Sequence, residues 1–140
     1  PTRRSSDLVS GRPFPAHELG AEGYLLMPAG RFGPAFVVTP NFYVLKEYNT
    51  SDLYALFIGH AGDRIRYGGR PFAGAWGKVD SLYRSDIAAM QRKLEQKGYD
   101  VGGADGLPGY KTRRSIGEWQ ASTGARPACF PTAEILRTLK

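Results

Sequence analysis

Cysteine is almost absent from this chain of 140 residues: Cys129 is the only one, so no disulfide can form within the chain. No apolar run approaches the roughly 20 residues that a membrane-spanning helix needs. No stretch combines a charged start with the 7–15-residue apolar run of a secretory signal either. We therefore expect no membrane span here. The chain is either cytoplasmic or lacks its true N-terminus.

Histidine is nearly as scarce, with two residues. His60 and Asp63 have a spacing at which two side chains on a helix could face one ion, but His60 falls in an apolar stripe, which favours a packed histidine. His17 and Glu18 lie in a polar, proline-containing segment without a third ligand. We expect no metal site, no other cofactor and no catalytic thiol at Cys129.

Positive charge is in excess but is not concentrated in one tract. Lys and Arg number 19 against 13 Asp and Glu, a formal net charge of +6. Such an excess attracts polyanions in general, whereas nucleic-acid binding calls for a clustered basic patch with interleaved aromatics. With 41% hydrophobic and 23% charged residues, the composition indicates a folded core and no nucleic-acid partner.

The first half of the chain predicts a β-hairpin followed by two helices. Runs rich in Tyr, Leu, Phe and Val at 22–27 and 35–39 flank a turn-forming segment, and Pro40 closes the second run. Asn41 is the expected N-cap of a short helix that ends at Asn49. Ser51 and Asp52 cap a second helix, whose apolar residues recur at helical spacing: Leu53, Leu56, Phe57, His60 and Ile65.

The second half predicts three short helices around one small core. The first is capped by Ser85-Asp86, carries Ile87, Met90 and Leu94 on one face, and stops at Gly98. The second runs from about 111 to 123 with Thr112, Ile116 and Trp119 on one face, and the third opens at Pro131-Thr132 with Ile135, Leu136 and Leu139 inward. Trp119 and Tyr99 are large enough to help close such a core.

A glycine-rich loop at 99–110 joins the first two of these helices. Asp105-Gly106 is a turn pair, because the Asp side chain can accept bonds from backbone N–H groups ahead of it and Gly tolerates positive φ. Thr112 lies in the first turn of the next helix, where its hydroxyl can satisfy a backbone donor. The N–H groups of that turn suit an anion such as a carboxylate.

The order of these residues resembles the peptidoglycan-binding-domain-1 family, a three-helix module that binds the bacterial cell wall. The pattern D-G-x-x-G-x-x-T spans Asp105–Thr112 and is followed by Trp119-Gln120; the resemblance covers about 85–139. Two departures are Trp119, where the family has Phe, and 126–130, which lacks the usual Asp-Gly. The expected wall contacts are Asp105, Gly106, Tyr110, Lys111, Thr112 and Arg113. The alternative is that most of these residues serve only the turn and cap.

Several short motifs at 20–76 resemble the end of the catalytic domain of the MltB-like lytic murein transglycosylase family. They include Pro28-Ala-Gly30, Pro40-Asn-Phe42 and Tyr48-Asn-x-Ser-x-x-Tyr54. The resemblance implies non-hydrolytic cleavage between MurNAc and GlcNAc, which leaves 1,6-anhydro-MurNAc ends, by one glutamate upstream of this region. Glu18, Glu22 and Glu47 lie outside the family's catalytic motif, so no catalytic residue is expected here.

Sugar contacts of that family correspond to Tyr48 and Asn49. An aromatic ring can stack on a sugar face, and an amide can bond both donor and acceptor groups of an N-acetyl substituent. The alternative is that Tyr48 is a core residue and Asn49 a helix stop.

Together these observations predict a mainly α fold with a small β-hairpin: a partial lysozyme-like transglycosylase domain at 20–77, a linker at 78–84 and a three-helix peptidoglycan-binding module at 85–140. Residues 1–19 are an expected disordered tail, whose first eight residues resemble a translated sequencing adapter. We expect a monomeric, periplasmic protein of the cell envelope, with its signal peptide upstream. The alternative is a free-standing, non-catalytic peptidoglycan-binding protein.

Overall fold

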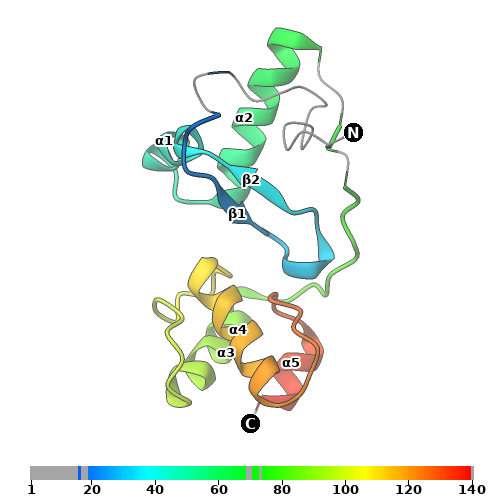
Figure 1. The fold of residues 1–140 in the computed structure, drawn as a ribbon. Coiled ribbons are helices and arrows are strands. Elements are labelled where there is room, and N and C mark those ends of the chain that lie inside the picture. Colours follow the sequence, from blue (N-terminus) through cyan, green and yellow to red (C-terminus); the bar gives the residue numbers. More distant parts are fainter. Residues whose placement is uncertain (1–15, 17–18, 69–70, 73, 140) are drawn as a thin grey trace. The chain divides into compact units, whose positions relative to one another are not determined.

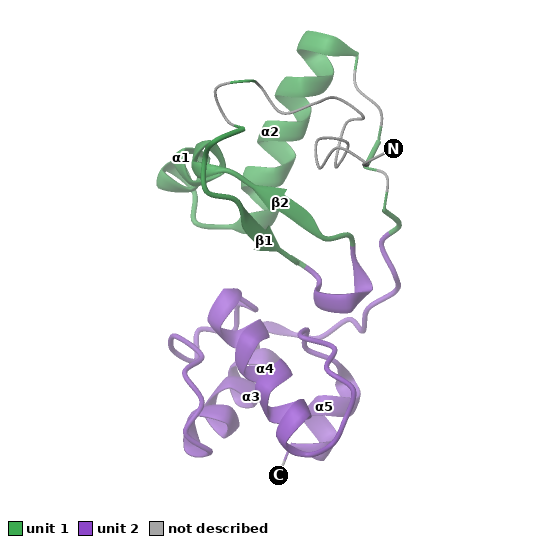
Figure 2. Cartoon of the chain, viewed as in Figure 1, with its two compact units in different colours: residues 1–28, 34–75 green, residues 29–33, 76–140 purple. Residues whose placement is uncertain are grey.

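The computed structural model describes residues 16, 19–68, 71–72 and 74–139 (Figure 1). The expected adapter-like segment at 1–8, together with His17 and Glu18, lies outside the described residues. The described residues divide into two compact units: those within 1–28 and 34–75, and those within 29–33 and 76–140 (Figure 2). No helix of the described residues has the length and hydropathy needed to cross a membrane.

The first unit contains the expected hairpin. Strands β1 (Tyr24–Leu26) and β2 (Phe36–Val38) pair antiparallel, with Tyr24 opposite Val38 and Leu26 opposite Phe36. The alternation places Leu26, Phe36 and Val38 on the buried face of the sheet, where Phe42, Leu56 and Phe72 pack against them.

Helix α1 (Pro40–Tyr48) begins two residues earlier than the sequence predicts, because its N-cap is Thr39 instead of Asn41. Thr39 is its N-cap and Pro40 its first residue, so Pro40 opens the helix as well as ending the strand. Proline suits this position because its fixed φ is helical and its missing N–H would have no partner there. Helix α2 (Asp52–Tyr67) has the expected cap, with the Tyr54 backbone N–H donating to Ser51 Oγ at 3.3 Å.

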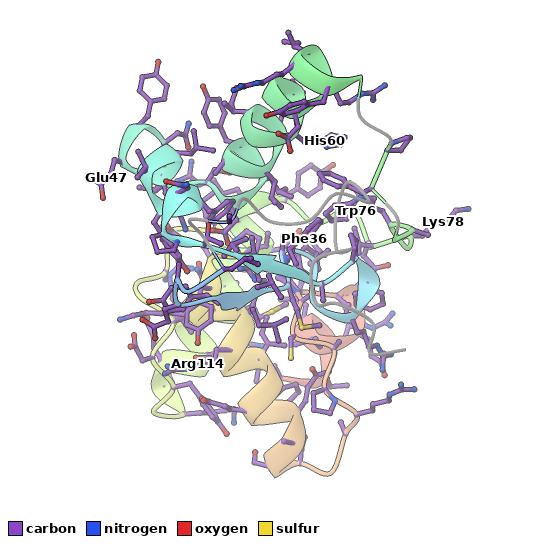
Figure 3. All side chains as sticks on the ribbon, turned by 45° about the horizontal axis from the view of Figure 1, so that its top comes forward. Phe36, Glu47, His60, Trp76, Lys78 and Arg114 are labelled. Carbon is purple, nitrogen blue, oxygen red and sulfur yellow. The ribbon has the colours of Figure 1, made fainter. Side chains whose placement is uncertain are left out.

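The predicted apolar stripe of α2 is largely wrong. Ala55 is its one buried residue, Leu56 and His60 are half-buried, and Leu53, Phe57 and Ile65 are exposed. His60 stacks on Phe72 with ring centroids 4.1 Å apart, and Phe72 in turn meets Phe36 edge-on at 5.1 Å (Figure 3 labels His60 and Phe36). A two-stranded sheet and one short helix cover only a narrow side of α2, so helical spacing alone overstates its buried face.

The second unit contains the three expected helices, but the predicted cap of the first is wrong: its N-cap is Tyr83 instead of Ser85-Asp86, and Asp86 accepts from the Tyr83 N–H at 2.9 Å from within the first turn. The helices are α3 (Arg84–Gln96), α4 (Tyr110–Ser122) and α5 (Ala133–Thr138). One core joins them, formed by Met90, Leu94, Val101, Ile116, Ile135 and Leu139, with Leu82, Tyr99, Trp119 and Leu136 packed against it. Gly98 and Gly124 follow the ends of α3 and α4 with φ of +87° and +76°, as their place after a helix predicts.

The 3₁₀ turn η2 (Gly30–Phe32), which links β1 to β2, belongs to this second unit (Figure 2). The Arg31 N–H donates to Ala128 O at 3.0 Å, and the Gly77 N–H donates to Phe32 O at 2.6 Å. Gly30 has a φ of +54°, and a Cβ there would overlap the carbonyl oxygens of Ala128 and Cys129. Residues 29–33 are therefore a packed component of the unit that contains the three helices.

The segment that receives this turn is the one at 126–130 that departs from the family pattern. The Ala128 N–H donates to the Gln120 side chain at 2.7 Å. Cys129 adopts a φ of +53°, unusual for a residue with a side chain, and its Sγ lies close above Gly117, 2.6 Å from where a Cβ would be. This segment lacks the family's Asp-Gly pair, and its backbone is held instead by contacts with α4 and with the turn at Arg31.

Candidate functional site

Gln91 on α3 organises the glycine-rich loop of the second unit. Its side chain is fully buried; Oε1 accepts from the Gly106 N–H at 2.7 Å, and Nε2 donates to Thr112 Oγ1 at 3.0 Å. Nε2 also lies 3.1 Å from both Asp105 Oδ1 and Leu107 O, so its two protons are shared among three acceptors. One amide therefore links α3, the loop and the start of α4.

The Asp105-Gly106 turn has the predicted form. Asp105 Oδ1 accepts from the Leu107 N–H at 2.8 Å, and the Gly106 φ is +77°. Arg84 packs against the turn. Its Nε donates to Asp105 O at 2.8 Å, and a Cβ on Gly106 would overlap the Arg84 backbone. The Leu107 N–H, then Gln91 and the Arg84 charge, hold the pKa of Asp105 below its ordinary value, so this carboxylate is ionised at neutral pH.

Thr112 and Arg113 lie elsewhere than expected. The Thr112 hydroxyl is buried. It accepts from Gln91 and donates to Val101 O at 3.2 Å, whereas the sequence predicted that it would accept from a backbone N–H. Arg113 is 7% exposed, and its Nη1 donates to Pro108 O at 2.9 Å. Both side chains stabilise the loop from within, so neither is presented to a ligand as an exposed group.

Tyr110 and Lys111, in contrast, are exposed at the start of α4. Tyr110 is 61% exposed, and no side chain caps the helix at Gly109. Lys111 Nζ lies 2.8 Å from Asp100 Oδ2. The bond from Lys111 and the Gly102 N–H lower the pKa of Asp100, so this exposed pair is charged on both sides at neutral pH. An aromatic ring and an ammonium group thus border a helix N-terminus that a rigid turn holds in place.

The two predicted sugar contacts in the first unit differ in how open their side chains are to a ligand. Tyr48 is 84% exposed, which excludes the core alternative for this chain, and its ring stacks on Tyr54 with centroids 6.2 Å apart. Asn49 is the C-cap of α1, and its Oδ1 accepts from the Ser51 N–H at 2.9 Å. Asn49 therefore ends the helix, and its side-chain carbonyl oxygen already has a partner.

The described glutamates of the first unit lie at its surface. Glu22 accepts from the Tyr24 hydroxyl at 2.8 Å, and Glu47 projects outward from α1 (Figure 3). A glutamate that acts as a general acid is characteristically held in an apolar environment. Among the residues that the structure describes, no three His, Cys, Asp or Glu side chains converge as metal ligands would.

The sequence analysis singled out none of Gln91, Arg84 and Asp100, and Gln91 makes the most contacts of the three in this site. A signal for it exists: Gln91 lies four residues after Ile87 and three before Leu94, on the apolar face of its helix. A polar residue at a core position needs partners, which are supplied here by the loop that carries the D-G pair.

Each unit is similar to a known protein family. Residues 3–63 match the family model described as Transglycosylase SLT domain, and residues 83–127 match that of a peptidoglycan binding domain. A comparison with curated protein sequences gives no match.

Two solved structures are similar over almost the whole chain. The crystal structure of SltB3 from Pseudomonas aeruginosa in complex with NAG-anhNAM-pentapeptide is 39% identical, with a TM-score of 0.73, over 92% of this chain and 34% of that chain. The complex of SltB3 with NAG-NAM-pentapeptide is 40% identical, with a TM-score of 0.73, over 93% of this chain and 35% of that one. The chain thus spans about a third of the length of these solved relatives.

Proposed function

Residues 3–63 belong to the transglycosylase SLT domain family and residues 83–127 to a peptidoglycan binding domain family, and from this premise we propose that the chain binds peptidoglycan through its second unit. The exposed start of α4 carries the proposal. Tyr110 offers a ring to the apolar face of a sugar or peptide, and the positive end of the α4 dipole attracts a stem-peptide carboxylate. Lys111 lies beside it as a hydrogen-bond donor, with its charge balanced by Asp100.

The other residues that the sequence indicated have a supporting part in this proposal. Asp105, Gly106 and Thr112 hold the loop through Gln91, and Arg113 fixes its Pro108 carbonyl. A loop held this way loses little conformational freedom on binding, which favours affinity. The contact surface proposed here is therefore Tyr110, Lys111 and the first turn of α4.

Replacing Tyr110 with alanine should weaken co-sedimentation of the chain with insoluble peptidoglycan sacculi by about tenfold, because the ring is an exposed aromatic anchor worth roughly 1–1.5 kcal/mol. Its exposure means that the melting temperature should change little. The measurement is the bound fraction against sacculus concentration, alongside a thermal melt by circular dichroism.

Tyr67→Ala is the matched control, since Tyr67 is similarly exposed at 52% but lies in the first unit. Equal binding by the parent, Tyr110→Ala and Tyr67→Ala proteins would place the contact elsewhere in the chain. No binding by the parent would refute peptidoglycan recognition itself.

The proposal for the longer parent protein is cleavage of the MurNAc-GlcNAc bond without water, giving 1,6-anhydro-MurNAc ends. The transglycosylase match over residues 3–63 favours this parentage over a free-standing, non-catalytic binding protein. Action on peptidoglycan also implies a periplasmic location in the cell envelope. Tyr48, exposed beside Tyr54, stays in the proposal as a sugar contact, with Asn49 next to it.

The 140-residue chain should release no 1,6-anhydro-muropeptides from sacculi, because the described glutamates of its first unit, Glu22 and Glu47, are exposed surface groups. Chromatography with mass spectrometry of the soluble products measures this, with an active lytic transglycosylase as the positive control. Anhydro products above the buffer background would show that the acid lies within the chain, and Glu22→Gln and Glu47→Gln variants would then locate it.

A further inference from the structure

A second aromatic surface lies in the first unit; it includes residues of α1, the helix that ends at Tyr48, but the function proposed above does not use it. Tyr24, Pro40 and Tyr43 line a depression of about 480 Å³. The depression is wide open to solvent, unlike the enclosed pockets that bury most of a small ligand. Tyr24 and Tyr43 are 39% and 41% exposed, so part of each ring is open to solvent.

The two tyrosines form a corner. Their ring centroids lie 5.4 Å apart with an interplanar angle of 82°, so one ring stands almost perpendicular to the other. Both are held on short regular elements: Tyr24 is in β1 opposite Val38, and Tyr43 follows the N-terminal Pro40 of α1 by three residues. Phe42 meets Tyr43 edge-on at 5.7 Å. Rings fixed in this way lose little rotamer entropy when a ligand contacts them.

Polar groups lie beside the corner formed by Tyr24 and Tyr43. The Tyr24 hydroxyl donates to Glu22 Oε2 at 2.8 Å, and this bond raises the pKa of Tyr24, so the phenol is neutral at physiological pH. Lys46 Nζ lies 5.9 Å from the centroid of the Tyr43 ring and is paired with Asp52. The Lys46–Asp52 pair is neutral overall, which leaves the Glu22 carboxylate as an acceptor beside the two rings.

We infer that this corner binds a pyranose ring of a glycan strand. A pyranose has an apolar C–H face that fits an aromatic ring and hydroxyls at its edge that a carboxylate can accept from. It carries no charge of its own at the ring, so its burial avoids the desolvation cost of an ion. The inference rests on the proposed function in one respect: it assumes that the natural ligand is the glycan strand of peptidoglycan.

The test is a titration of the whole 140-residue chain with N,N′,N″,N‴-tetraacetylchitotetraose, followed by NMR of the tyrosine ring and backbone signals. Signals of Tyr24 and Tyr43 should shift together. Tyr24→Ala and Tyr43→Ala should each weaken the binding at this site about tenfold. Tyr24→Phe keeps the ring and should keep most of the affinity, and Tyr67→Ala, an exposed tyrosine outside the depression, should leave it unchanged.

The outcomes separate this site from the one on α4. Shifts confined to the second unit, or equal affinities for the parent, Tyr24→Ala and Tyr43→Ala proteins, would overturn the inference and leave sacculus binding intact. Shifts at Tyr24 and Tyr43 caused by a lysine-containing stem tripeptide, but not by the tetrasaccharide, would overturn the glycan assignment. Loss of sacculus binding with the tetrasaccharide shifts retained would refute the proposed function alone. Circular dichroism shows whether each variant is folded.

Discussion

Replacement of Gln91 with leucine should unfold the second unit at room temperature or nearly so. The substitution leaves the Gly106 N–H without its partner. It also removes the bonds from Gln91 to Leu107 O and Thr112 Oγ1, which keep their bonds with the Gly109 N–H and with Val101 O. The unpaired Gly106 N–H costs about 1–3 kcal/mol, and each of the other lost hydrogen bonds costs about 0.5–1.5 kcal/mol. A loss of about 4 kcal/mol or more would remove most of the stability of so small a domain.

The matched control is Gln96→Leu, on the same helix but exposed. Amide hydrogen exchange over residues 84–139 should show lost protection in Gln91→Leu and parental protection in Gln96→Leu. A melting temperature for Gln91→Leu within about 4 °C of the parent would mean a cost near 1 kcal/mol or less, too small for the central role assigned to this amide.

Replacement of Gly30 with alanine should destabilise the same unit, although Gly30 lies far from it in sequence. The φ of +54° costs about 1–2 kcal/mol for a residue with a Cβ, and the overlap with the Ala128 and Cys129 carbonyls adds about 1–3 kcal/mol. We expect a total of about 3 kcal/mol, measured as the change in free energy of unfolding in urea and as faster amide exchange at 112–139.

Gly124→Ala provides the control within that unit. Its φ of +76° imposes the same kind of backbone strain, but nothing lies within 4 Å of the added Cβ. Its cost should therefore be about 1 kcal/mol. Equal costs at Gly30 and Gly124 would show that the contact with 128–129 contributes nothing, and that only the backbone conformation counts.

The three helices of the second unit could be predicted from sequence because each has local start and stop signals. Asp86, Thr132, Gly98 and Gly124 act within a few residues of where they lie. The comparisons confirm both family resemblances, and the structure confirms a mainly helical fold with one hairpin. The strongest motif, Asp105-Gly106, was recognised correctly as a turn for the same local reason.

The errors concern contacts between residues distant in sequence. The sequence predicts an exposed Arg113 because it is charged and near a helix start. Its side chain is instead buried, where it donates to the Pro108 carbonyl of the loop. Leu53, Phe57 and Ile65 were expected in a core because of their spacing, but spacing does not say how much surface the neighbouring elements can cover. Gln91 was missed because its partners lie 14 to 21 residues away.

The packing of the turn Gly30–Phe32 against Ala128 also has a consequence for folding rates. The hydrogen bond from Arg31 to Ala128 joins residues roughly 100 positions apart, whereas the contacts among α3, α4 and α5 span much shorter loops. Short loops close first, so we expect the three helices to assemble before the turn docks. Interactions that form after the transition state slow unfolding and leave the rate of folding almost unchanged. The docked turn would then lengthen the lifetime of the folded unit, and Gly30→Ala would shorten it without delaying refolding.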